Sequence, residues 1–544
     1  MTSRENPDVA PDVLDDEAGD SMVEKLVTGI PSFDVIAKGG LPKTRTTLLS
    51  GTAGSGKTVF AMHFLAAGIM QAKEHGVFVT FEESASDIRK NVRNFGWDLA
   101  AWERDRALAF VDASPDPHVE TIEAGAFDLS ALLARVEHAV KRVNAKRVSV
   151  DSLGAIFSQF SDQSIVRREL FRIASALKQM GVTAVMTAER TDEYGPIARF
   201  GVEEFIADNV MVLRNTLEAE NRRRTIEIVK FRGTDHQKGE YPFTIMPTRG
   251  MVVIPLSAIQ LRQKSSNVRI SSGNGEVDEM CGGGFFRDSV ILVSGATGTG
   301  KTLTVTQFIK GGASNGERCL LLAFEESREQ LFRNASGWGA DFERMERDGM
   351  LRVLCDYPEV AGLEDWLVQI QSEIEAFNPK RVALDSLSAL ERMGSPKAFR
   401  EFVIGLTSFL KHRETAGLLT STTPSLMGGS SITEGHISTL TDSIILLRYV
   451  EMFGEMKRGL TVLKMRGSMH DRSIREFTID ASGMHIGRRF GNVTGILGGA
   501  PMHVTPGDVE RTWSQLDARI DARQRTGSDA DIERRRPEGP RPSS

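Results

Sequence analysis

Two glycine-rich segments of this 544-residue sequence have the spacing of a phosphate-binding loop. They are GTAGSGKT at 51–58 and GATGTGKT at 295–302, and both fit the pattern GxxxxGK[ST]. In such a loop (P-loop), backbone N–H groups converge on phosphate oxygens, the lysine reaches the β- and γ-phosphates, and the last hydroxyl binds Mg²⁺. The sequence therefore predicts two sites for ATP and Mg²⁺, formed by Gly51, Thr52, Ala53, Gly54, Ser55, Gly56, Lys57, Thr58, Gly295, Ala296, Thr297, Gly298, Thr299, Gly300, Lys301 and Thr302.

Acidic residues recur at matching places in the two halves. Asp151 follows the apolar run RVSV and Asp385 follows RVAL, so each carboxylate ends a strand, where it can hold the Mg²⁺ shell. Two glutamate pairs end another strand, where a carboxylate can orient or deprotonate the attacking nucleophile. We expect the first glutamate of each pair to face the γ-phosphate. The four candidates are Glu82, Glu83, Glu325 and Glu326. The alternatives are that each aspartate only caps the next helix and that the glutamates lie in a solvated turn. Their recurrence in both halves favours the metal role for the aspartates and the catalytic role for the glutamates.

Cations lie late in each half, far in sequence from the P-loops. Lys230 and Arg232 occupy KFRGTDH, and Lys464 and Arg466 occupy KMRGSMH. In a ring of P-loop domains such residues can contact a neighbour's γ-phosphate, as an arginine finger does. The alternative is a basic sheet edge that discourages aggregation.

An internal repeat organises the chain. The P-loops are 244 residues apart, TFEES and AFEES 243, and RVSVDSL and RVALDSL 234, as are KFRGTDH and KMRGSMH. Four ordered matches indicate a duplication, with about ten residues lost from the second copy.

Short apolar strands alternate with amphipathic helices such as 129–143, which predicts an α/β fold. Each copy is expected to be a P-loop domain with a mostly parallel sheet flanked by helices. The expected order is an acidic, disordered segment (1–21), a first domain (22–256), a linker (257–270), a second domain (271–486) and a tail (487–544).

Composition argues against some classes of protein. A net charge of −6 gives no bulk attraction to nucleic acid or anionic membranes. No apolar run is long enough to span a membrane. The three cysteines lack paired or metal-ligand spacing, which favours reduced thiols and a cytoplasmic location.

The chain from about 22 to 505 resembles the KaiC family, the tandem RecA-like ATPases of the cyanobacterial clock. The resemblance is carried by RRRTIEIVKFRGTDHQKGEYPFTI and by GHISTLTDSIILLRYVEMFGEMKRGLTVLKMRGSMHDRSIREF. It implies a double-ring homohexamer that hydrolyses ATP in the first ring and phosphorylates itself in the second, with Glu82 and Glu325 catalytic and Glu325 also near the metal. Further ATP contacts implied by it are Lys230, Phe231, Arg232, His236, Trp338, Arg458, Lys464, Met465 and Arg466.

The family's phosphate acceptors map to Ser438 and Thr439 of the intact HIST segment, with Thr433 a subsidiary hydroxyl. The 234-residue offset aligns these acceptors with Glu204 and Phe205, so only the second copy offers hydroxyls there. If Lys464 and Arg466 reach a neighbour's ATP, phosphotransfer would pass between subunits. The alternative for HIST is an ordinary Ser/Thr-rich turn.

The tail departs from the family pattern. An apolar stripe, made of Val509, Trp513, Leu516 and Ile520, suits a short coiled coil or a partner groove. It could join rings into a dodecamer, and its divergence argues against a KaiA-like partner. A KaiB-like partner on the first ring is a further expectation. Competing functions are a DNA motor like RecA or DnaB, for which basic channel loops are missing, and a nucleotide-gated scaffold without kinase activity.

Overall fold

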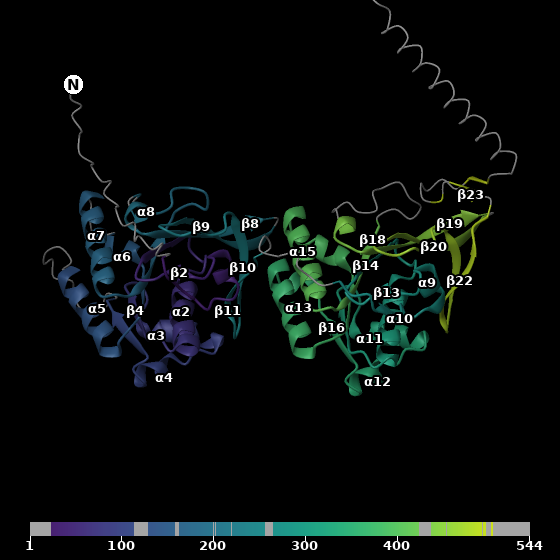
Figure 1. The fold of residues 1–544 in the computed structure, drawn as a ribbon, viewed down its shortest axis with the longest axis horizontal. Coiled ribbons are helices and arrows are strands. Elements are labelled where there is room, and N and C mark those ends of the chain that lie inside the picture. Colours follow the sequence, from purple (N-terminus) through teal and green to yellow (C-terminus); the bar gives the residue numbers. More distant parts are fainter. Residues whose placement is uncertain are drawn as a thin grey trace, which may run out of the picture. The chain divides into compact units, whose positions relative to one another are not determined.

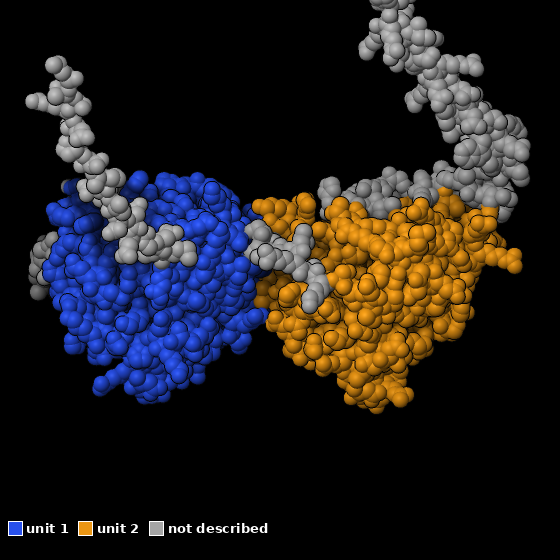
Figure 2. All heavy atoms as spheres, in the orientation of Figure 1, with its two compact units in different colours: residues 1–259 blue, residues 260–544 orange. Residues whose placement is uncertain are grey.

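The computed structural model describes residues 23–113, 129–157, 163–199, 201, 203–218, 220–255, 265–423, 437–452, 454–491, 493–494, 496 and 502–503. The chain divides into two compact units, residues 1–259 and 260–544 (Figure 2). The expected disordered segment, the tail stripe and Thr433 lie outside the described residues. Within them, no helix is long and apolar enough to cross a membrane.

The first unit contains a sheet of nine strands among its described residues (Figure 1). In sheet order, β5, β4, β6, β7, β3 and β8 are parallel, and β9, β10 and β11 continue the sheet antiparallel. The strands are β3 (Thr46–Gly51), β4 (Gly76–Thr80), β5 (Leu108–Asp112), β6 (Arg147–Asp151), β7 (Thr183–Glu189), β8 (Asn209–Glu218), β9 (Asn221–Phe231), β10 (Glu240–Met246) and β11 (Gly250–Val253).

The described residues of the second unit repeat this order strand for strand, as β16, β15, β17, β18, β14, β19, β20, β21 and β22. The strands are β14 (Val290–Gly295), β15 (Cys319–Ala323), β16 (Leu351–Cys355), β17 (Arg381–Asp385), β18 (Ala416–Thr422), β19 (Ser443–Met452), β20 (Glu455–Met465), β21 (Arg475–Asp480) and β22 (Gly483–Arg489). The duplication read from the motifs therefore extends to the whole topology.

Helices cover both faces of each sheet (Figure 1). In the first unit they are α1 (Phe33–Ile36), α2 (Lys57–Ala67), α3 (Ala85–Asn91), α4 (Leu99–Arg104), α5 (Leu129–Val143), α6 (Leu153–Phe157), α7 (Gln163–Gln179) and α8 (Glu203–Ile206), with the single turns η1 (Gly68–Ala72) and η2 (Arg93–Phe95). In the second they are α9 (Gly275–Met280), α10 (Lys301–Ser314), α11 (Arg328–Gly337), α12 (Phe342–Arg347), α13 (Leu363–Phe377), α14 (Leu387–Glu391) and α15 (Pro396–His412), with η4 (Pro358–Val360) and η5 (Ile437–Thr439).

The strand sequences explain the two-sided covering. Along β4, Phe78 packs into the core under α2, α3 and α4, whereas Val77 and Val79 pack into the core under α5, α6 and α7. Successive side chains of a strand point to opposite faces, so a strand that is apolar at every position must be buried on both. The predicted α/β fold of two tandem P-loop domains is confirmed.

Two boundaries differ from those expected. Arg269–Ile270, which we placed in the linker, forms β12 and pairs with β13 (Phe285–Phe286). At the other end, β22 continues to Arg489, past the expected limit at 486. Polar composition suggested a linker at the first of these places, but pairing at a sheet edge tolerates polar residues. The first unit has a matching small sheet, β1 (Lys25–Leu26) with β2 (Leu41–Pro42), and β23 (Val493–Thr494) pairs with β24 (Met502–His503).

Candidate nucleotide sites

Each P-loop connects the central strand of its sheet to the first long helix. The helices α2 and α10 begin at Lys57 and Lys301, and the preceding Gly56 and Gly300 have φ angles of 94° and 106°. Only glycine adopts such angles without strain, so the pattern's last glycine lets the loop turn directly into a helix. The helix N-terminus then offers free N–H groups and a positive dipole end to a phosphate.

The two P-loop lysines fold back onto their own loops. Lys57 donates to the carbonyls of Gly51 and Thr52, both at 3.0 Å. Lys301 donates to the equivalent Gly295 and Ala296 at 3.0 and 3.1 Å. Burial lowers the pKa of both ammonium groups, and nearby carboxylates oppose this lowering. Each ammonium group thus lies against the loop that would hold the phosphates.

A hydroxyl and a carboxylate meet beside each lysine. Thr302 Oγ1 donates to Asp385 Oδ2 at 2.8 Å, and Thr58 bonds Asp151 in the same way. Burial raises the pKa of both aspartates, while these hydrogen bonds lower it. Hydroxyl and carboxylate oxygens are the ligands that Mg²⁺ takes, usually together with substrate phosphates. This pair of oxygen donors fits Mg²⁺ bound with a nucleotide. Among the described residues, no group of three or more His, Cys, Asp or Glu could hold a metal ion.

The two glutamates of the first unit's pair make contacts in different directions. Glu82 Oε1 accepts a hydrogen bond from Ser152 Oγ at 2.6 Å, and its charge acts on Lys57. Glu83 instead accepts from Asn91 Nδ2 at 3.0 Å, on α3. The structure therefore turns the first glutamate towards the P-loop of the first unit and the second glutamate away from it.

The second unit has a less clear division. Glu325 acts electrostatically on Lys301 and lies 3.6 Å from Arg392. Glu326 accepts from Asn334 Nδ2 at 3.2 Å, and burial together with the charge of Asp385 raises its pKa. Both carboxylates thus lie near Asp385, and Glu325 is the one whose charge reaches the lysine.

The late cations of the second unit hold the backbone of the expected acceptors. Lys464 Nζ donates to the carbonyls of Ser438 and Thr441, both at 2.6 Å. Arg466 Nη2 donates to the carbonyl of Thr439 at 2.8 Å. Ser438 is half-buried and Thr439 is exposed. We call this group the acceptor edge.

The first unit builds the same edge without hydroxyls. Lys230 Nζ donates to the carbonyls of Glu204 and Ala207, both at 3.0 Å, and Arg232 Nη2 donates to that of Phe205 at 3.0 Å. These bonds match those of the second unit under the 234-residue offset. The side chain of Phe205 is 64% exposed. The alignment of Glu204 and Phe205 with the acceptors, inferred from the offset, thus corresponds to a shared backbone geometry.

The acceptor edge lies opposite the P-loop of its own unit. Strand β19 is parallel to β14 and begins at Ser443, which pairs with Ile291, near the start of β14. The P-loop follows Gly295, at the other end of β14. Strand β20 is antiparallel, so Met465 pairs with Ser443 and brings Lys464 and Arg466 to the same distant edge. These cations and the acceptors cannot reach the nucleotide of their own P-loop.

The remaining expected contacts fall in several places. The side chains of Phe231 and Met465 are buried in the cores, so only their backbone is open to a ligand. His236 packs edge-on against Phe231 at 5.4 Å. Trp338 caps the end of α11 and is half-buried. Arg458 lies on β20 over the ring of Tyr449, at 5.7 Å.

Some site residues were missed by the motif search. Arg224, which the 234-residue offset pairs with Arg458, donates from Nε to the carbonyl of Gly54 in the P-loop at 3.3 Å. Tyr449 also lies next to the second P-loop, because a Cβ placed on Gly298 would be 2.8 Å from the Tyr449 hydroxyl. Thr187 and Thr420 donate to Asp151 and Asp385. The 234-residue offset was the signal that could have found Arg224. The threonines are equivalent only by strand register, because Thr187 pairs with Leu49 and Thr420 with Val293.

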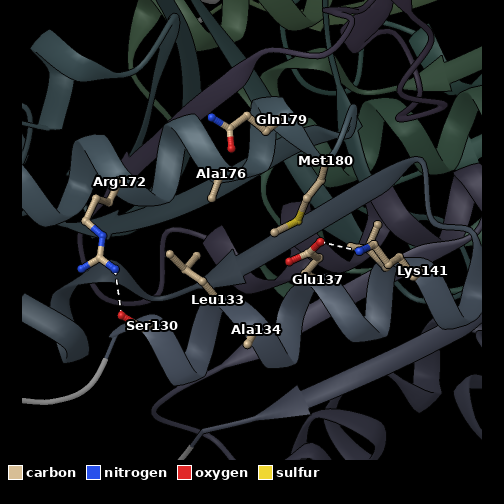
Figure 3. A pocket seen from close by; sticks show the side chains of 10 residues that line it. Ser130, Leu133, Ala134, Glu137, Lys141, Arg172, Ala176, Gln179 and Met180 are labelled. Atoms are coloured by element: carbon tan, nitrogen blue, oxygen red, sulfur yellow. Dashed lines mark hydrogen bonds and ion pairs between the residues drawn. The ribbon is translucent and has the colours of Figure 1, made fainter.

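A hollow of about 470 Å³ in the first unit is a separate feature (Figure 3). Side chains of α5, α7 and the turn after α7 line it, with Arg172 bonded to Ser130 at 2.9 Å and Glu137 paired with Lys141. None of the P-loop residues line this hollow, and it lacks their converging N–H groups. It is not the nucleotide site.

Comparison with known proteins identifies relatives along nearly the whole chain. The family model of the KaiC ATPase matches residues 26–258 and 270–489. A circadian clock protein KaiC3 of Synechocystis sp. is 64% identical over 498 residues, covering 92% of this chain and 98% of that protein. The circadian clock oscillator protein KaiC of Thermostichus vulcanus is 57% identical over 489 residues, covering 90% and 94%. That of Synechococcus elongatus is 56% identical over 483 residues, covering 89% and 93%.

Proposed function

Because this chain belongs to the KaiC ATPase family, we propose that it is a timing or signalling hub that hydrolyses ATP in its first domain and phosphorylates itself in its second. The acceptors are Ser438 and Thr439. The observation that carries this proposal is the acceptor edge, where Lys464 and Arg466 hold the backbone of two residues whose hydroxyls are missing from the first copy.

The two reactions differ only in the nucleophile. In the second domain the hydroxyl oxygen of Ser438 or Thr439 forms a bond to the γ-phosphorus, its proton passes to Glu325, and the bond to the β-phosphate oxygen breaks to release ADP. In the first domain water attacks instead and its proton passes to Glu82. Mg²⁺, held by Thr58 with Asp151 and by Thr302 with Asp385, would neutralise charge on the phosphates.

Each nucleotide would lie between two subunits. The acceptor edge cannot reach its own P-loop, so Lys464 and Arg466 must approach the ATP of a neighbour if they serve as fingers. A head-to-tail contact of this kind forms a ring when its rotation closes, and we propose a homohexamer with Arg232 and Lys230 serving the first ring. Joining of rings into a dodecamer through the tail is a further possibility to test by mass.

Partners and location follow from the same family. The relatives are named circadian clock proteins, and we propose a KaiB-like partner for the first ring. The divergent tail gives no basis for a KaiA-like partner. Free thiols at Cys281, Cys319 and Cys355 support a reducing, cytoplasmic compartment.

The test is a phosphate map. The purified protein is incubated with Mg-ATP for hours, and peptides across 425–450 are followed by mass spectrometry. We expect phosphate on Ser438 and Thr439, and none there in Glu325→Gln. ATP hydrolysis without phosphate at either residue would contradict the proposed autokinase activity and leave a scaffold or a DNA motor as the function. Hydrolysis stimulated by added DNA would then indicate the motor, and hydrolysis unaffected by DNA the scaffold.

A further inference from the structure

The two copies differ at the residue that flanks the start of the P-loop. In the first unit β7 ends at Glu189, which pairs with Gly51. In the second unit β18 ends at Thr422, which pairs with Gly295. Equal register on the P-loop strand makes these two positions equivalent, so an acid stands in one nucleotide site and a neutral hydroxyl in the other.

Glu189 faces the catalytic groups. Thr187, two residues earlier on the same strand, bonds Asp151, and side chains two apart on a strand share a face. Burial lowers the pKa of Lys57, and Glu189 opposes this more than Asp151 or Glu82 does. Carboxylates from the ends of β4, β6 and β7 thus surround one lysine.

The space beside Glu189 is also specific to the first copy. A Cβ on Gly154 would lie 3.6 Å from Ser152 Oγ and 3.9 Å from Glu189 Oε2. Because Ser152 donates to Glu82, both glutamates lie close to Gly154. The carboxylates of Glu82 and Glu189 can therefore act on one small molecule between them.

The second copy closes this space. Ser388, which the 234-residue offset aligns with Gly154, accepts the Thr422 N–H at 2.8 Å and lies 3.4 Å from Ser421 Oγ. The carboxylates that oppose the lowered pKa of Lys301 are Asp385 and Glu325. Thr422, at the position of Glu189, carries no charge.

We propose that Glu189 is a specificity-determining residue that makes the first site a hydrolytic one, by holding the attacking water beside Glu82. In this arrangement one proton of the water passes to Glu82 as its oxygen bonds the γ-phosphorus. The second hydrogen stays on the attacking oxygen and donates a hydrogen bond to Glu189. The bond between the γ-phosphorus and the β-phosphate oxygen breaks, and ADP leaves with its electrons. A serine or threonine hydroxyl has only one hydrogen, which passes to Glu325. The second site therefore needs no counterpart of Glu189 to accept a second hydrogen bond. This inference rests on the proposed function.

The experiment uses the full chain with Glu325→Gln, which silences the second site. We expect Glu189→Thr to lower the kcat of ATP hydrolysis by about tenfold to a hundredfold, the range of a lost positioning contact. Binding of a fluorescent ATP analogue should stay within about twofold, since Glu189 holds water and not phosphate. Glu189→Gln keeps one acceptor oxygen and should retain more activity than Glu189→Thr.

Glu193→Thr is the matched control. Glu193 also acts on Lys57, but its oxygens accept from Thr52 Oγ1 at 2.6 Å and from the Asn215 N–H at 3.0 Å. Its loss should disturb the loop and hence nucleotide binding. An unchanged kcat in Glu189→Thr, an equal kcat loss in the control, or a matching loss of nucleotide binding would overturn the inference. Hydrolysis surviving in Glu82→Gln with Glu325→Gln would instead contradict the proposed function itself.

Discussion

Phosphate transfer should pass from the ATP of one subunit to the acceptors of the next. The Asp442 N–H, beside the acceptor edge, bonds the carbonyl of Val290 at 2.8 Å. Gly295 at the P-loop lies five residue steps beyond Val290 on the extended strand, or about 16 Å away. In-line attack needs reacting atoms roughly 3–3.5 Å apart. A hydroxyl on Ser438 or Thr439 would have to move along the length of β14 to reach the ATP of its own subunit.

Two complementary variants test this. Glu325→Gln keeps both acceptors but lacks the expected base, and Ser438→Ala with Thr439→Ala keeps the base but lacks acceptors. Neither should gain phosphate in the HIST segment by itself. If a ring subunit meets one neighbour at its acceptor edge, then in a random one-to-one mixture about a quarter of all subunits should become phosphorylated. These are the Glu325→Gln subunits whose neighbour has an intact base.

The assay labels the Glu325→Gln subunits with heavy nitrogen before the two variants are co-assembled. Mass spectrometry then reports which subunit carries each phosphate, and native mass spectrometry verifies that rings are mixed. Phosphate should appear only on heavy peptides. Mixed rings that stay unphosphorylated, while the unsubstituted protein gains phosphate under the same conditions, would refute the reasoning from strand register.

Two stability predictions follow from buried charged groups. His63 accepts a hydrogen bond from the Met251 N–H, and burial lowers the pKa of His63 to about 4. Between pH 6.5 and 4, His63 is therefore protonated in the unfolded state but not in the folded state. The free energy of unfolding of the first unit should fall by up to about 3 kcal/mol over that range, and His63→Gln should flatten the dependence measured by urea denaturation. Arg381, 1% exposed, pairs with Glu317 at 2.6 Å, so Arg381→Met should cost about 3–5 kcal/mol. Calorimetry should show this loss of stability in the unfolding transition of the second unit. Arg147→Met, at the equivalent position of the first unit, should instead lower the transition of the first unit. Equal shifts of both transitions in either variant would contradict this.

The motifs were sufficient to predict the fold because each lies at a point where the topology changes. A P-loop must join a central strand to a helix, and the equal spacing of later motifs implies equal elements between them. The strong 3.6-residue periodicity of 129–143 predicted the helix whose bounds are those of α5. Boundaries failed where Arg269–Ile270 pairs at a sheet edge, since edge strands carry little apolar signal.

From the internal repeat alone, site residues could be predicted only where the two copies agree; the expected acceptors Ser438 and Thr439 came from the family resemblance. A repeat search finds residues that both copies share, such as Lys57 with Lys301, and passes over those that differ. Glu189 was invisible for that reason, and its relation to Thr422 needed the pairing of both with the P-loop strand. The backbone contacts of Lys464 were equally hidden, because a sequence does not say which carbonyls a lysine reaches.

The two domains share one fold and differ at two places, the acceptor edge and the residue beside the P-loop. The residues at both places can be exchanged between the domains by substitution. Lys230 and Arg232 already hold the backbone of Glu204 and Phe205 as the second copy holds its acceptors. Glu204→Ser with Phe205→Thr should therefore present hydroxyls to the neighbouring first-domain ATP, and peptides across 200–210 should gain phosphate. Adding Glu189→Thr should raise that phosphate relative to ATP hydrolysed, because water loses its acceptor while the hydroxyl does not. No phosphate in Glu204→Ser with Phe205→Thr, with ATP hydrolysis intact, would mean that backbone anchoring alone does not bring a hydroxyl to the γ-phosphate.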